Sequence, residues 1–472
     1  MVKVYQPKVE VTLIKVVTRD RSVTEAATGP DTLIDLTPFL GESGVVQFSR
    51  GVNQPAGVFS VELVDQASSQ TGDSVYSMIE PMDIVEIRMA REPHGYDQLP
   101  VVFRGFVHFI KRSEKMGSNG KPLRRVIVSG RDWGGLLQAI QLFYKKDYAI
   151  GQIMLNTFPM FVSYGVSFEN LVPKDFVEKI VNSIVNPWLD ELWLASSLEQ
   201  ALRLNVNASV TTGRVGPYTI QPYEGSIWSL LEQWTDFAWN EIIFDDDNNG
   251  STLIYRAKPY RDSRTDQLIL EDAKEPDRVL LEIDAVVSLT AERNLDQVAN
   301  YYHVTTPQAY LNHPELINVE AMQKGSVYKT DYPNCDPAIY GLRKATEISQ
   351  MTSGENTRSA IGEKSQKIKN YAARHHTWME NRRDKLFDMR KDNVVLESGS
   401  LKLRGDERIK PGVEIEINRG GLRAIYYPTN VTHTFEVFGT YTTEVQFIRG
   451  TGFIKRLEQP NYLNEIARGV YD

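Results

Sequence analysis

The sequence predicts a β-dominated α+β protein, in which two β-barrels flank a mixed helical insertion and a long helix precedes the closing strands of the second barrel. Short alternating segments bounded by Gly, Pro, Asn and Asp fill both ends of the chain, and apolar residues at helical spacing fill the middle. With 472 residues, 41% hydrophobic and 24% charged, the chain has room for about three domains of ordinary globular composition. We therefore expect apolar burial to stabilise the fold without disulfides or metals.

The first barrel is predicted over residues 1–135. Segments such as Val9–Leu13 and Val58–Val64 alternate apolar and polar residues, as strands with one buried face do. Several such segments at short spacing are typical of a barrel or sandwich.

Residues 136–280 are predicted to form a mixed α/β insertion domain. A helix is expected to begin after Ser226, a suitable N-cap, and a hairpin follows. The hairpin turn, Asp245–Gly250, opens like a calcium-binding EF-hand loop, but its twelfth position is Arg256 instead of a bidentate carboxylate. We therefore interpret it as a turn between strands.

The second barrel is predicted over residues 281–450, interrupted by a helical segment at 340–392, and residues 451–472 form a C-terminal tail. The helical stretch 364–391 holds nine basic and three acidic residues. Runs of charge usually lie on solvated or partner-facing helices, so this composition favours a protein-facing helix over a nucleic-acid site.

The two barrel regions share one pattern: a proline, three residues, and then an apolar-Glu-apolar triplet, followed by a strand with a histidine between apolar neighbours. This pattern predicts a duplicated barrel, and chance similarity between two unrelated barrels is the alternative. Because strand side chains alternate, the triplet's apolar residues should be buried in both copies, and the histidines should be hydrogen-bonded packing residues. The residues concerned are Pro81, Val85, Ile87 and His108, and then Pro411, Ile415, Ile417 and His433.

Motifs of a known family span most of residues 80–450. They include Phe103-Arg-Gly-Phe-Val, Val128-Ser-Gly-Arg-Asp-Trp, Glu224-Gly-Ser-Ile-Trp-Ser-Leu-Leu, Asn300-Tyr-Tyr-His-Val, Leu401-Lys-Leu-Arg-Gly, Ile409-Lys-Pro-Gly-Val-Glu-Ile, Val431-Thr-His-Thr-Phe and Gly439-Thr-Tyr-Thr-Thr-Glu-Val-Gln-Phe-Ile-Arg. In this order and spacing the motifs resemble the tail hub family, which comprises contractile-phage baseplate hub proteins, late control protein D and the hub half of type VI secretion spike proteins.

The resemblance implies two tail-tube-like barrels in a non-enzymatic structural subunit without cofactors. It implies a homotrimer whose six barrels form a pseudo-sixfold ring with a lumen for genome ejection. The implied partners are a tail spike protein, tail tube and tape-measure proteins, and baseplate wedge or adaptor proteins. The implied location is the baseplate of a virion tail. The first residues lack the apolar core of a signal peptide and the single Cys335 suits a reducing compartment, so we expect assembly in the host cytoplasm.

Composition and motifs argue against several other functions. A net charge of −8 disfavours sequence-independent binding to nucleic acid, which draws its affinity from Lys and Arg. No specific nucleic-acid binding is expected either. The uncharged stretch 148–168 is long enough to be considered as a membrane span, but its polar residues and Pro159 favour a buried segment, so we expect no stable membrane insertion.

Catalytic, cofactor and metal sites are not expected. Cys335 lies in a turn-like Pro-Asn-Cys-Asp-Pro context, upstream of His375 and His376, and the histidines form no zinc motif. A tail-associated peptidoglycan hydrolase and a host-surface binding module remain the alternatives to a structural hub subunit.

Overall fold

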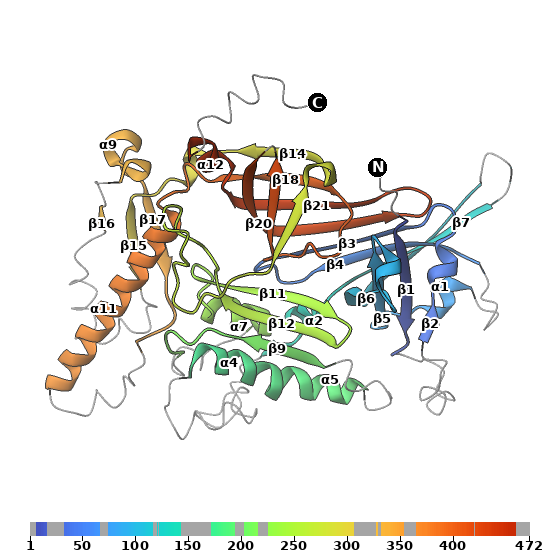
Figure 1. The fold of residues 1–472 in the computed structure, drawn as a ribbon. Coiled ribbons are helices and arrows are strands. Elements are labelled where there is room, and N and C mark those ends of the chain that lie inside the picture. Colours follow the sequence, from blue (N-terminus) through green and yellow to red (C-terminus); the bar gives the residue numbers. More distant parts are fainter. Residues whose placement is uncertain are drawn as a thin grey trace, which may run out of the picture.

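The computed structural model describes residues 6–16, 33–66, 74–116, 120, 122–142, 171–193, 203–215, 225–305, 327–328, 332–353, 365–419 and 421–458. Thirteen strands form one large sheet, and eleven of them follow the order β14-β18-β21-β20-β3-β4-β7-β6-β5-β1-β2 (Figure 1). The other two branch from this path, because β13 runs parallel to β19 and β19 runs antiparallel to β20. The prediction of a β-dominated α+β fold is confirmed.

The large sheet is built from strands at both ends of the chain. The N-terminal strands are β1 (Lys8–Ile14), β2 (Leu33–Asp35), β3 (Val45–Gly51), β4 (Val58–Val64), β5 (Ile84–Ala90), β6 (Val101–Met116) and β7 (Pro122–Arg131). The C-terminal strands are β13 (Arg278–Glu282), β14 (Val286–Glu292), β18 (Glu397–Arg404), β19 (Glu414–Arg419), β20 (Leu422–Glu436) and β21 (Tyr441–Gly450).

The two halves of the sheet meet where β20 pairs antiparallel with β3, over seven residue pairs (Figure 1). Each half packs its own apolar core. The N-terminal core includes Val11, Phe59 and Phe103, and the C-terminal core includes Leu403 and Ile415. Alternation explains these cores, since inward residues of each strand are buried while their neighbours remain accessible.

Between the halves lies an insertion with a core of its own, built from helices and a three-stranded sheet. Its helices are α2 (Trp133–Ala139), α4 (Pro173–Ile180), the π-helical segment η7 (Val181–Val185), α5 (Asn186–Trp193) and α7 (Ile227–Trp234). Its strands are β8 (Gln141–Leu142), β9 (Leu204–Ala208), β10 (Gly225–Ser226), β11 (Asn240–Asp247) and β12 (Gly250–Ala257). The predicted cap of α7 is confirmed, because the Ser226 hydroxyl accepts a hydrogen bond from the Ser229 amide at 3.1 Å.

The second barrel region is interrupted by more than a helix. Strands β15 (Tyr301–Thr305), β16 (Val327–Tyr328) and β17 (Lys344–Ile348) form a separate small sheet, which packs beside helix α11 (Ser365–Arg390). The predicted helical segment 340–392 therefore contains a strand. The remaining α-helices of the described residues are short: α1 (Val75–Met78) in the first half, α9 (Pro337–Tyr340) and α12 (Gly452–Glu458). None of these helices is long and apolar enough to cross a membrane.

Candidate functional site

Eight consecutive strands of the large sheet, from β14 to β6, present one accessible face that we call the polar face. The pairing registers bring alternate side chains of these strands to the same side. Its polar members are Ser288, Thr290, Glu292, Ser400, Lys402, Arg404, Thr442, Glu444, Gln446, Asn430, Thr432, Thr434, Gln47, Ser49, Ser60, Glu62, Ser129, Arg125, Arg131, Lys111, Ser113 and Lys115. Uncharged polar side chains are the majority, charges of both signs are interspersed, and a few apolar residues such as Val58 and Phe109 interrupt them.

The polar face continues across the junction between the two halves. At that junction the Ser49 hydroxyl donates to the Asn430 side-chain oxygen at 3.0 Å, and the Thr432 hydroxyl donates to Ser49 at 2.9 Å. These residues lie 381 and 383 positions apart in the sequence. The side-chain bonds reinforce the backbone pairing of β20 with β3, so the two halves present one surface.

On the opposite side of the junction, His433 is buried and fully hydrogen-bonded. Its Nε2 lies 3.0 Å from the carbonyl oxygen of Ile409, which can only accept, so this nitrogen donates and Nδ1 is the acceptor. The Tyr441 hydroxyl lies 3.0 Å from Nδ1, and the ring stacks on Phe48 with centroids 4.8 Å apart. Burial lowers the pKa of His433 to about 4, so the ring is neutral at pH 7.

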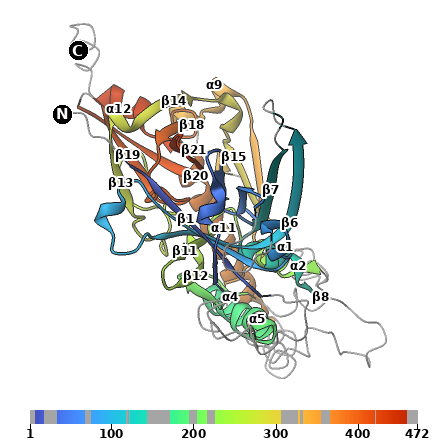
Figure 2. The same cartoon turned by 90° about the vertical axis from the view of Figure 1, so that its right-hand side faces the viewer.

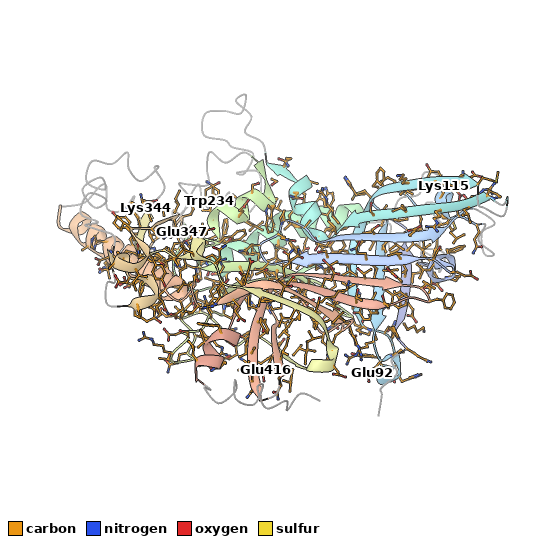
Figure 3. All side chains as sticks on the ribbon, turned by 90° about the horizontal axis from the view of Figure 1, so that it is seen from above. Glu92, Lys115, Trp234, Lys344, Glu347 and Glu416 are labelled. Carbon is orange, nitrogen blue, oxygen red and sulfur yellow. The ribbon has the colours of Figure 1, made fainter. Side chains whose placement is uncertain are left out.

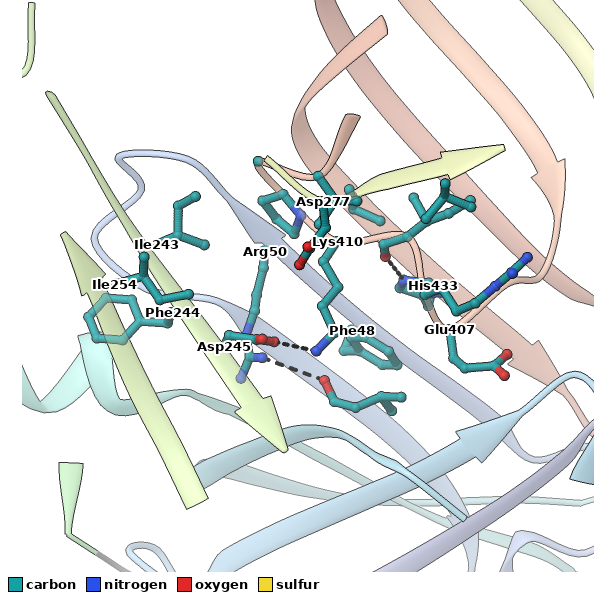
Figure 4. Close-up of a pocket in the computed structure, with 18 of the residues that line it drawn as sticks. Phe48, Arg50, Ile243, Phe244, Asp245, Ile254, Asp277, Glu407, Lys410 and His433 are labelled. Atoms are coloured by element: carbon teal, nitrogen blue, oxygen red, sulfur yellow. Dashed lines mark hydrogen bonds and ion pairs between the residues drawn. The ribbon is translucent and has the colours of Figure 1, made fainter. Parts of the chain in front are cut away.

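A cavity of about 340 Å³ lies beneath the junction, where both halves meet the β11–β12 hairpin of the insertion (Figure 4). Its wall combines apolar side chains such as Phe48 and Ile243 with several charged groups. Lys410 donates to the Asp245 carboxylate at 2.6 Å, as Figure 4 shows. The charged residues of the wall are Arg50, Asp245, Arg256, Asp277, Glu407, Arg408 and Lys410.

Arg50 links the first half to the insertion through buried ion pairs. Its guanidinium contacts Asp246 of β11 and lies 3.2 Å from Asp132, the N-cap residue of α2. All three side chains are at least nine-tenths buried. Burial opposes the charge on Arg50, but the two carboxylates raise the pKa of the guanidinium. Burial also raises the pKa of Asp132 to about 6, against the attraction of Arg50.

A second buried cluster links the insertion to the C-terminal half. Arg256 donates to Glu241 at 2.8 Å and to the carbonyl oxygen of Gly412 at 2.6 Å. The Tyr427 hydroxyl of β20 donates to the same Glu241 oxygen at 2.6 Å. Burial, together with the Glu241 charge, raises the pKa of Tyr427 well above its usual value. Since the cavity's principal cations are paired with carboxylates or carbonyls, the cavity has the chemistry of a structural junction.

The predicted repeat residues occupy comparable strands in the two halves. Val85 and Ile87 are buried on β5, and Ile415 and Ile417 are buried on β19. β5 pairs with β6 and β6 with β7, just as β19 pairs with β20 and β20 with β21. Pro81 and Pro411 precede β5 and β19 by the same number of residues.

The registers allow the two halves to be compared residue by residue. Val85 pairs with Gly105, and three residues later β6 has a bulge at His108. Ile415 pairs with Tyr426, and three residues later β20 has a bulge at Thr429. The bulges therefore fall at matching positions.

The two histidines do not correspond. His108 matches Thr429 and is exposed, whereas His433 lies four residues beyond the bulge and is buried. The expectation that both histidines are packing residues is therefore wrong for His108. Val107 is buried, so simple alternation already points His108 outward, and the bulge instead turns Phe109 to the exposed side.

Other sequence candidates have structural explanations. Asp247 pairs with Gly250 across the β11–β12 hairpin, so the EF-hand-like segment is the predicted turn. Cys335 is buried in the short helix η12 (Pro333–Cys335), with its thiol 3.6 Å from the Tyr332 carbonyl oxygen. Within the described part of the chain, no three His, Cys, Asp or Glu residues are grouped to hold a metal. The stretch 148–168 and the side chain of His375 lie outside the described residues.

The buried ionic residues of the junction were not identified from sequence. One available indication is the alternation of β3, which places Arg50 on the inward side with Val46 and Phe48. An inward arginine in a strand needs a buried partner, although its position in the sequence does not say which. Asp246 gives no such indication, because it lies in the acidic run that also forms the hairpin turn.

No family model matches this chain, and no curated protein matches it. Among solved structures it is similar to phage tail and baseplate proteins. A tail protein from Neisseria meningitidis matches with a TM-score of 0.49 and 10% identity, over 95% of this chain and 98% of that one. The 43 kDa tail protein of prophage MuSo2 from Shewanella oneidensis matches with a TM-score of 0.44 and 11% identity, over 94% and 97%. A type VI secretion system component from E. coli, described as similar to T4 tail proteins, matches with a TM-score of 0.39 and 9% identity, over 86% and 73%.

Proposed function

We propose that the chain is a structural hub subunit of a phage-type tail, which forms a trimeric, pseudo-sixfold ring between the tail tube and a central spike. The observation that supports this most directly is the matching order and register of the two strand sets. Strands β3, β4, β5, β6 and β7 correspond to β14, β18, β19, β20 and β21, and their bulges coincide. A duplicated barrel accounts for both the pairing order and the bulge, whereas two unrelated barrels would share neither.

The duplication gives a physical reason for the trimer. A subunit with two similar barrels presents two similar sets of contacts, so three copies can meet a sixfold tube on one side and a threefold spike on the other. In this proposal residues 1–135 and 281–450 are the two tail-tube-like barrels, residues 136–280 are the insertion domain that braces them, and residues 451–472 are a C-terminal tail.

We assign the polar face to the lumen of the ring. A duplex passing through a channel must not be held, and binding to duplex DNA derives its affinity from clusters of Lys and Arg that displace counterions. The polar face offers mainly Ser, Thr, Asn and Gln, and its charges are partly neutralised by pairs such as Lys402 with Glu444 at 2.7 Å. Its composition therefore suits passage of the genome during ejection.

The proposed partners follow from this position in the tail. The ring would contact a tail spike protein below, tail tube and tape-measure proteins above, and baseplate wedge or adaptor proteins around it. The subunit would assemble in the host cytoplasm and remain in the baseplate of the virion tail.

Mass photometry of the full chain, alone and mixed with the products of neighbouring tail genes, tests the assembly. We expect a trimer, formed alone or once the spike protein is added. A stable dimer or a hexamer of the chain would contradict the proposal. Cryo-electron microscopy of the mixture would then show which surface faces the lumen.

The competing hydrolase function has a separate test. Cys335 is 1% exposed and its thiol faces a backbone carbonyl, so it lacks the access that a nucleophile requires. We expect no cleared band on a peptidoglycan zymogram. A band that disappears in Cys335→Ala would replace the structural proposal with an enzymatic one. Binding of the isolated chain to glycans or cells would favour the host-surface module instead.

A further inference from the structure

We infer that strand β14 of one copy pairs antiparallel with the outer part of β6 of the next copy, with Lys111 opposite Glu292. This inference rests on the proposed trimer and specifies the surfaces that form it. It derives from the pairing that already joins the two halves within one chain.

Both strands have an open edge. In the described part of the chain, β14 pairs only with β18, so its other edge has no partner strand. β6 pairs with β5 only from Val101 to Phe106, and beyond that point it pairs only with β7. Figure 2 shows β6 and β7 extending side by side as a long hairpin, and Figure 3 places Lys115 near the end of it. Open edges of this length are sites for adding a strand from another chain.

Within the chain, the corresponding edges are already paired. By the register comparison, β20 corresponds to β6 and β3 corresponds to β14. The junction β20–β3 is therefore the internal counterpart of a contact between β6 of one copy and β14 of the next. Repeating that contact around a ring would join the eight-stranded polar faces of three copies into one continuous surface.

The internal junction also fixes the register of the proposed contact. The bulges align His108 with Thr429, so Thr432 corresponds to Lys111 and Thr434 to Ser113. On the other strand, Phe48 pairs with Phe59, and Phe59 pairs with Gly130. The matching series of pairings in the C-terminal half ends at Ala291, so Ala291 corresponds to Phe48. Ser49 then corresponds to Glu292 and Gln47 to Thr290.

The internal pairs Thr432–Ser49 and Thr434–Gln47 thus translate into specific pairs between copies. Lys111 would lie opposite Glu292 of the next copy, and Ser113 opposite Thr290. Both charged side chains are exposed, and neither has an ion-pair partner among the described residues of its own chain. Opposite charges across paired strands stabilise the pairing, and no part of the derivation used charge. Their complementarity is therefore independent support for the register.

Disulfide cross-linking in the full chain tests the register. Cysteines at positions directly opposite one another in paired strands lie within the distance that a disulfide spans. We expect the double variant Ser113→Cys with Thr290→Cys to form, under mild oxidation, covalent species that end at a trimer. The matched control is Ser113→Cys with Ala291→Cys, because position 291 faces the other side of β14 and should not cross-link. The native Cys335 is buried and should not react.

Charge exchange provides a second measurement that does not depend on oxidation. Because Lys111 and Glu292 are exposed, their substitution should leave the thermal melt of the subunit unchanged. Lys111→Glu or Glu292→Lys alone would place like charges opposite each other and weaken trimer formation by about tenfold. The double exchange should restore it.

The outcomes separate the inference from the proposed function. Equal cross-linking of both cysteine pairs, or a double exchange as weak as either single one, would overturn the register. A trimer without any cross-link between these positions would overturn this interface and leave the hub proposal standing. A chain that remains monomeric, both alone and with its tail partners, would overturn both.

Discussion

Protonation of His433 should weaken the junction between the two halves of the sheet. The neutral ring donates to the Ile409 carbonyl and accepts from the Tyr441 hydroxyl, and a second proton would remove the acceptor. The pKa of His433 is lowered to about 4 by burial, whereas an unfolded histidine titrates near pH 6.5. At pH values between about 4 and 6.5 the unfolded chain binds a proton at His433 that the folded chain does not. Stability is therefore present above pH 6.5 and is lost as the pH falls through 4.

These two pKa values give the size of the effect. At pH 5 the unfolded histidine is almost fully protonated, and the folded one is mostly neutral. The difference corresponds to a loss of about 2 kcal/mol of unfolding free energy between pH 7 and pH 5. Because His433 stacks on Phe48 of β3, the loss should be concentrated where β20 pairs with β3.

His433→Gln is the informative variant, since glutamine retains a donor for the Ile409 carbonyl and does not titrate. Its unfolding free energy should be lower than that of the native chain at pH 7, by about 1 kcal/mol, and should change less between pH 7 and pH 5. Denaturant unfolding and hydrogen exchange of peptides covering 45–51 and 430–436 measure this. The exposed His108→Gln is the control and should keep the native pH profile. If His433→Gln loses as much stability on acidification as the native chain, the assignment of the effect to His433 is refuted.

Three further outcomes follow from the structure. Arg50→Met should lower the unfolding free energy by about 3–5 kcal/mol, since it leaves Asp132 and Asp246 buried without their cation. In the same denaturation experiment the control Arg124→Met, which breaks an exposed ion pair, should lower it by less than about 1 kcal/mol. Gly130→Ala should lower the unfolding free energy of the chain by about 1–3 kcal/mol, because a β-carbon there would overlap the Phe106 carbonyl oxygen. The control Gly95→Ala lies in open space and should leave the thermal melt unchanged. Duplex DNA should not be retained by the chain at physiological salt in a gel-shift assay, because the chain has a formal charge of −8 and the proposed trimer would carry about −24, three times −8. Tight, salt-sensitive binding that disappears on charge reversal within 364–391 would contradict this last expectation.

Local features of the fold were predictable from sequence because they depend on neighbouring residues. The alternation of strands such as β4, the cap at Ser226 and the hairpin turn at Asp247 each follow from patterns a few residues long. The strand at Lys344–Ile348 was missed inside a predicted helical segment, since a short strand with one partner leaves only a weak pattern.

The pairing partners could not be predicted in the same way. A period of two shows which side of a strand is buried, but it does not show that β20 will lie beside β3. Likewise, Arg50 was recognisable as an inward charge, but its contact with Asp246 depends on how the insertion docks. His433 lies two residues from buried Val431 and Phe435, whereas His108 directly follows buried Val107, so alternation already separates the two histidines. The bulge that exposes Phe109 could not be predicted in this way.

The buried ions explain how one surface can extend over both halves of the sheet. Arg50 links the N-terminal half to the β11 strand of the insertion, and Glu241 of that same strand holds Tyr427 of the C-terminal half. Removing water from such groups costs free energy, so their net contribution to stability is small, but each pair is satisfied in only one arrangement. The insertion therefore acts as a brace that selects the relative orientation of the two halves. In the proposed ring, the edges at β14 and β6 would have to meet those of other copies at a fixed angle. Closure of that ring would therefore depend on this buried network as well as on the exposed edges.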